Sequence, residues 1–149
     1  MVKSVEEILD YAIAREQQAV DFYTKLSNMA PGIQLQQLMR DYAAEEQRHK
    51  DKLLAVKTDG ALDNAHKQPL DLKMADYLVD VEETPEMTYQ DALIIAMKRE
   101  QVAFLLYTDL AEKVESPELK SLFEALAREE ASHKNYFESE YDDKIYTDN

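Results

Sequence analysis

The sequence predicts an all-α fold, a bundle of four helices formed by two copies of one helical hairpin. Residues 9–50 align without a gap with residues 93–134, at a constant offset of 84 positions. A fixed internal period of this kind indicates a duplicated structural unit. The composition agrees, because the 149 residues include 2 Gly and 4 Pro and are rich in Ala, Leu, Glu, Lys and Gln, which favour helices.

Local signals mark the ends of the predicted helices. Ser4 with Glu7, and Thr88 with Asp91, have the spacing of capping boxes at helix starts. Ala30-Pro31-Gly32 predicts a hairpin turn. The apolar periodicity then predicts four helices, over about residues 5–29, 33–58, 89–114 and 117–141.

The chain has the length of one ordinary domain. We divide it into a first hairpin at about 5–58, a crossover at about 59–88, a second hairpin at about 89–141 and a tail, 142–149, that we expect to fray. The crossover is long for a connection between helices, as a passage along the length of a bundle requires. Within it, residues 71–79 have helical spacing, and we expect them to lie across the bundle.

Composition and charge exclude several classes of function. The formal net charge of −14 argues against nucleic-acid binding, which needs clustered Lys and Arg. No apolar run approaches the roughly 20 residues of a membrane span, and the N-terminal residues lack the apolar core of a signal peptide. Without Cys the chain holds no disulfide and no iron–sulfur or rubredoxin centre. We therefore expect a cytoplasmic protein.

Each repeat places acids and a histidine on an apolar helix face. Glu46 with His49 and Glu130 with His133 form two Glu-x-x-His elements, and residues three apart share a face of a helix. A further Glu precedes each element by 30 positions. The candidate metal ligands are Glu16, Glu46, His49, Glu100, Glu130 and His133. The predicted inward face of the second helix is Leu35, Leu38, Tyr42, His49, Leu53 and Val56.

Burying four carboxylates and two imidazoles costs many kcal/mol unless something compensates the charges. Two divalent cations would neutralise four carboxylates. Carboxylate with imidazole suits iron or manganese, and also zinc, and the same set of residues builds di-metal sites in helical bundles. A solvated Glu-x-x-His pair, merely duplicated, is the alternative explanation, but it does not account for acids in the middle of an apolar stripe.

Other residues near these acids have weaker claims. Helical angle alone does not decide between Glu46 and its neighbour Glu45, which we take, with Glu129, as flanking acids rather than extra ligands. Tyr23 and Tyr107 follow the first Glu of each repeat by seven residues. They are either plain core or hydrogen-bond donors to the ligating carboxylates. His66 has no partner in the other repeat, and we interpret it as a surface residue.

These motifs resemble the rubrerythrin branch of the ferritin-like superfamily. The resemblance extends to the run 71–79 and to the ending Glu140-Tyr141-Asp142-Asp143. It implies a ferritin-like four-helix bundle with a long crossover between its second and third helices. It also implies a carboxylate-bridged di-iron centre that reacts with hydrogen peroxide or oxygen, in which Glu46 and Glu130 bridge and act catalytically and the other ligands are mostly terminal.

The sequence departs from that family in two ways. It has no Cys-rich rubredoxin domain, so electrons must come from a separate protein such as rubredoxin, or from ferrous iron. Rubrerythrins also carry a second Glu three residues from the ligand of the third helix, Glu100. Here those positions are Met97 and Ala103. We expect a homodimeric di-iron oxidoreductase that reduces peroxide. The alternatives are a ferroxidase that feeds iron storage and a metal-free helical interaction module.

Overall fold

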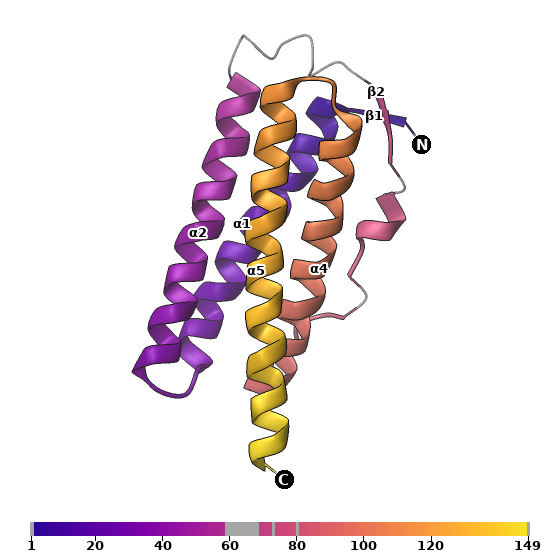
Figure 1. Ribbon diagram of the computed structural model, residues 1–149. Coiled ribbons are helices and arrows are strands. Elements are labelled where there is room, and N and C mark those ends of the chain that lie inside the picture. The colour runs from indigo at the N-terminus through magenta and orange to yellow at the C-terminus, as the bar shows by residue number, and fades with distance from the viewer. Residues whose placement is uncertain (1, 59–68, 73, 80, 149) are drawn as a thin grey trace. The chain divides into compact units, whose positions relative to one another are not determined.

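The computed structural model of the chain describes residues 2–58, 69–72, 74–79 and 81–148 (Figure 1). Long helices make up most of these residues, which confirms the all-α prediction. The chain divides into two compact units, residues 1–72 and 73–149, and each unit contains one copy of the repeated hairpin. None of the helices in the described ranges is long and apolar enough to cross a membrane.

The first unit is a hairpin of helices α1 (Val5–Met29) and α2 (Ile33–Thr58), with the predicted bounds. The predicted capping box starts α1: the Glu7 N–H donates to the Ser4 hydroxyl, and the Ser4 N–H donates to the Glu7 carboxylate, both at 3.1 Å. Gly32, in the turn between the helices, has a φ of 89°. Residues other than glycine rarely adopt this backbone conformation, because their Cβ atom clashes with the backbone.

A small antiparallel sheet corrects the prediction for part of the crossover. Strand β1 (Val2–Ser4) pairs with strand β2 (Pro69–Asp71), with Lys3 opposite Leu70. Residues 71–79 have helical spacing in the sequence. The structure has instead the end of β2 and a short 3-10 helix, η2 (Met74–Tyr77), because strand β2 gains its hydrogen bonds from a segment distant in sequence. His66 and the first part of the predicted crossover, residues 59–68, lie outside the described residues.

The second unit contains η2 and a hairpin of helices α4 (Tyr89–Lys113) and α5 (Pro117–Asp148). The predicted capping box of Thr88 and Asp91 starts α4. The Tyr77 hydroxyl, at the end of η2, donates to the Asp109 carboxylate of α4 at 2.5 Å. Helix α5 continues past its predicted end near residue 141, because no Gly or Pro follows Pro117 to stop it.

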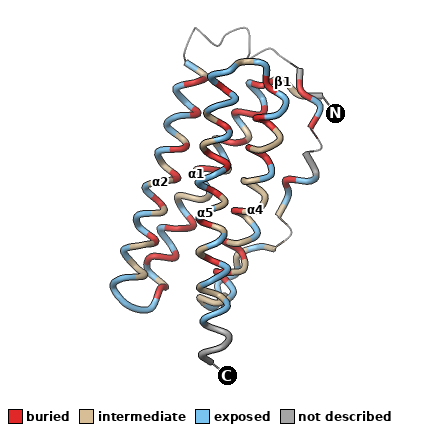
Figure 2. Tube along the Cα trace, viewed as in Figure 1, coloured by how far each residue is buried: buried red, intermediate tan, exposed pale blue. Residues whose placement is uncertain are grey.

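Buried and exposed residues alternate with helical period along all four helices (Figure 2). The predicted inward face of α2 was wrong in its first half. Leu35, Leu38 and Tyr42 are only partly buried. The buried residues of α2 are Met39, Ala43, Glu46, His49, Leu53 and Val56. The prediction followed the largest apolar side chains, whereas the buried stripe passes through a small residue, Ala43, and an acid.

Candidate metal centre

The first hairpin brings Glu16, Glu46 and His49 together. Glu16 comes from the middle of α1, and the other two come from adjacent turns of α2. The three residues are between 0 and 3% exposed. The His49 Nδ1 atom lies 3.7 Å from Glu16 Oε1 and 3.5 Å from Glu46 Oε2. Two carboxylates from two helices therefore face one imidazole nitrogen in a site closed to solvent.

The second hairpin repeats this arrangement with Glu100 of α4 and Glu130 and His133 of α5. These residues are 2–3% exposed. The His133 Nδ1 atom lies 3.7 Å from Glu100 Oε1, the same separation as between the corresponding atoms of the first hairpin. The sequence repeat is therefore a repeat of side-chain geometry and not of helices alone.

Burial distinguishes the two acids that stand next to each other in each repeat. Glu46 is fully buried, whereas Glu45 is partly exposed and lies 3.9 Å from Arg48 at the surface. In the second hairpin Glu130 is buried and Glu129 is exposed. The choice of Glu46 and Glu130 as the inward acids agrees with this burial.

The ionisable groups of the first site shift one another's pKa values. Burial, together with the neighbouring Glu46 carboxylate, raises the pKa of Glu16 well above its usual value. Burial by itself would lower the pKa of His49, but the carboxylates of Glu16 and Glu46 outweigh it and raise that pKa to about 10. In the absence of a cation His49 is therefore protonated at neutral pH, and the raised pKa of Glu16 means that this carboxyl takes up a proton more readily than an exposed glutamate does.

The geometry and chemistry of both sets fit a metal ion. In each hairpin the two carboxylates and the imidazole offer ligand atoms within 4.8 Å of one another. Two atoms that bind one ion at about 2.0–2.2 Å lie roughly 3–4 Å apart at ordinary bond angles. The separations of 3.5 and 3.7 Å from His49 Nδ1 to the two carboxylates fall in that range and exceed the usual length of a hydrogen bond. Oxygen and imidazole ligands without thiolate suit iron, manganese or zinc.

The two tyrosines predicted near the ligands are buried, each 1% exposed. The Tyr23 ring meets Tyr42 edge-on, with centroids 6.0 Å apart. The Tyr107 ring stacks on Phe123 at 6.1 Å. Both rings therefore pack in the cores of their hairpins, and a hydrogen bond from either hydroxyl to a ligand carboxylate stays a prediction.

One contact beside the ligands was missed by the sequence analysis. The Lys50 ammonium donates to the Gln17 side-chain oxygen at 2.6 Å, and these two residues directly follow His49 and Glu16 in sequence. The sequence repeat gave a sign of this pair, because Gln101 and Lys134 occupy the corresponding positions of the second repeat. There Lys134 pairs with Glu138 of its own helix at 2.9 Å. The two hairpins thus differ in the partner of the lysine that follows each ligand histidine.

Comparisons with known proteins bear on the fold and the family of the chain. The chain resembles a Thermotoga maritima protein described as a ferritin-like diiron-carboxylate protein, with a TM-score of 0.82, 20% identity, and coverage of 95% of this chain and 97% of that one. It also resembles a hypothetical protein from Pyrococcus furiosus, with a TM-score of 0.73, 27% identity, and coverage of 96% and 91%. No curated protein matches. These likenesses confirm the ferritin-like four-helix fold. The family model for rubrerythrin matches residues 7–141, nearly the whole chain, which therefore belongs to the rubrerythrin family.

Proposed function

We propose that the two Glu-Glu-His sets assemble into one dinuclear iron site and that the protein is an oxidoreductase that reduces hydrogen peroxide. The observation that supports this most is the repeat of the same three buried ligands, with the same 3.7 Å separation, in both hairpins. Membership of the rubrerythrin family favours the same assignment.

Charge balance supports two divalent cations rather than one. The four carboxylates Glu16, Glu46, Glu100 and Glu130 carry four negative charges when ionised, and two such cations cancel them while both imidazoles stay neutral. By resemblance to the family, Glu46 and Glu130 would bridge the two ions, and the remaining residues would bind one ion each. Manganese or zinc could occupy the same ligands, so iron is a proposal that rests on the reaction.

The reaction requires two electrons and two protons to convert one hydrogen peroxide molecule into two water molecules. When bound, a pair of ferrous ions supplies the two electrons. Glu46, His49, Glu130 and His133 are buried, so the site is closed to bulk water. Burial raises the pKa of the Glu16 carboxyl, so this group takes up a proton more readily than an exposed glutamate does. A separate protein would then return the electrons, since the chain has no Cys to hold a redox centre of its own.

An anaerobic ferrous titration followed by rapid mixing tests this function. We expect two irons per chain, about 3.5–4 Å apart, and faster oxidation by hydrogen peroxide than by oxygen, with about one peroxide consumed per site. Glu46→Ala and Glu130→Ala should abolish the reaction and leave the helices formed, since Ala favours helix. Glu45→Ala and Glu129→Ala are the matched controls and should retain it.

The other outcomes identify the alternatives. Oxidation of many irons per chain in a large hollow particle would indicate a ferroxidase for iron storage, whereas gel filtration should show a dimer if the proposal holds. Faster reaction with oxygen would indicate an oxidase. A protein that binds no metal would be a helical interaction module.

A further inference from the structure

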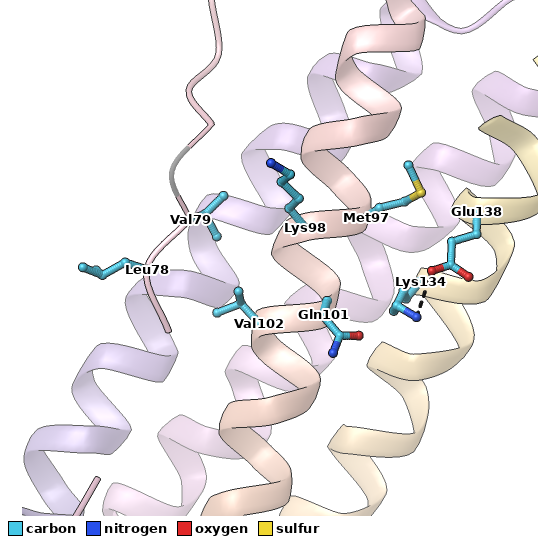
Figure 3. A pocket seen from close by; sticks show the side chains of 8 residues that line it. All are labelled: Leu78, Val79, Met97, Lys98, Gln101, Val102, Lys134 and Glu138. Atoms are coloured by element: carbon cyan, nitrogen blue, oxygen red, sulfur yellow. Dashed lines mark ion pairs between the residues drawn. The ribbon is translucent and has the colours of Figure 1, made fainter. Parts of the chain in front are cut away.

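Met97 lines a surface trough of the second hairpin. The trough has a volume of about 320 Å³ and is bordered by the crossover segment, α4 and α5 (Figure 3). Figure 3 shows the Met97 side chain extending from α4 toward α5, where Lys134 and Glu138 stand. A water molecule occupies about 30 Å³ in the liquid, so a molecule as small as hydrogen peroxide has room to reach the thioether.

Helical spacing places Met97 next to a candidate ligand. Met97 precedes Glu100 by three residues on α4, and the Cβ atoms of residues three apart on a helix are about 5–6 Å from each other. Met97 is partly exposed, whereas Glu100 is 2% exposed. Met97 therefore stands at the boundary between the trough and the closed ligand set, where peroxide can meet it without entering that set.

Among the methionine side chains that the structure describes, the others do not combine exposure with a place beside the ligands. Met39 of α2 is 0% exposed. Met29 at the end of α1 and Met87 before the start of α4 are partly exposed, but each is 13 residues from the nearest candidate ligand in the sequence. The first hairpin has the partly buried Ile13 at the position of Met97, so the thioether belongs to one repeat alone.

Oxidation of a thioether by hydrogen peroxide needs no metal and no electron donor. A lone pair of the sulfur attacks one peroxide oxygen, so that an S–O bond forms while the O–O bond breaks. The proton of the transferred hydroxyl group ends on the departing hydroxide, which leaves as water; the sulfur loses two electrons and the peroxide gains them. A hydrogen-bond donor near the departing oxygen favours this step. The Gln101 amide lines the same trough, and Lys134 pairs with Glu138 at 2.9 Å rather than with this amide, unlike the corresponding lysine of the first hairpin.

The product, methionine sulfoxide, is a polar side chain in place of a flexible apolar one. Met97 is partly buried, so the new oxygen either loses water or pulls the side chain away from α5, and both cost free energy. We propose that Met97 is a site of reversible oxidation by hydrogen peroxide, and that its sulfoxide weakens the packing of α4 on α5 in the hairpin that carries Glu100, Glu130 and His133. This inference goes beyond the proposed oxidoreductase function and does not depend on it.

The first test treats the metal-free and the zinc-loaded protein with hydrogen peroxide and locates sulfoxide by peptide mass spectrometry. Zinc has no redox chemistry, so the sulfoxide comes from peroxide directly. Met97 should be oxidised roughly two- to tenfold faster than Met29 and Met87, the effect of one hydrogen bond to the departing oxygen, and Met39 should stay unoxidised. Gln101→Leu should bring Met97 to the rate of the two comparison residues. Oxidation of Met97 no faster than that of Met29 and Met87 in the wild type would overturn the assignment.

The second test measures the consequence as a melting temperature. The peroxide-treated wild type should melt about 3–6 °C below the untreated protein, and treatment with methionine sulfoxide reductases should restore the original value. Met97→Leu, which nearly conserves side-chain volume, should keep its melting temperature after peroxide, whereas the matched control Met87→Leu should lose as much as the wild type. An equal drop in Met97→Leu and the wild type, or no drop in a wild type that carries the sulfoxide at Met97, would overturn the proposal.

Discussion

Metal binding should release protons from the first hairpin, in an amount that follows from its geometry. The Glu16 and Glu46 carboxylates raise the pKa of His49 to about 10 against the effect of burial, so this imidazole is protonated at pH 7 in the cation-free protein. A metal ligand must be the neutral imidazole. The pKa lies about 3 units above pH 7, and each unit corresponds to 1.36 kcal/mol. Removal of this proton therefore costs about 4 kcal/mol, a factor of about 1,000 in apparent affinity.

The assay is calorimetric titration of the protein with Mn²⁺ at pH 7 in buffers that differ in ionisation enthalpy. At least one proton per chain should be released, and the logarithm of the apparent affinity should rise by about one per pH unit between pH 7 and 9. Glu16→Gln removes one of the carboxylates that raise the pKa of His49, so it should reduce the number of protons released. Glu45→Gln, at the partly exposed flanking position, is the control and should release as many as the wild type. No proton release, with an affinity that is flat over this range, would refute the reasoning.

Three further predictions concern occupancy and stability. Anaerobic metal analysis should find fewer than two ions per chain in His49→Ala and in His133→Ala but not in His66→Ala. Removal of a ligand should lower the metal affinity by more than the roughly 10–100-fold expected when a hydrogen-bond partner of a ligand is removed. The raised pKa values of Glu16 and His49 mean that the folded metal-free protein binds more protons than the unfolded chain. The free energy of unfolding of the metal-free protein should therefore fall as pH rises from about 4.5, the usual pKa of a glutamate, to about 10, the pKa of His49. The gain in melting temperature on adding Mn²⁺ should therefore grow with pH, and a gain that shrinks would contradict this sign. Ser4→Ala should lower the free energy of unfolding by about 1 kcal/mol, measured by urea denaturation, through loss of the 3.1 Å bond that caps α1; an unchanged midpoint would show that the cap contributes nothing.

The sequence by itself determined the features whose causes are local or periodic. The capping boxes at Ser4 and Thr88 join residues three apart, so they could be found without any tertiary information. The bounds of α1 and α2 followed from these signals and from the turn at Gly32. Because the six candidate ligands are placed by helical spacing within a duplicated unit, their burial in two matching sets was also foreseeable.

Only the tertiary structure decided the features that depend on partners distant in the chain. Helical angle left Glu45 and Glu46 undecided, and burial against α1 selects Glu46. The strand at 69–71 exists because it pairs with residues 2–4, a contact without a sequence signal in either three-residue segment. Likewise the repeat predicts equivalent lysines at positions 50 and 134, yet one bonds to the neighbouring helix and the other to its own. The side chains within reach differ between the two hairpins, and a spacing rule cannot supply them.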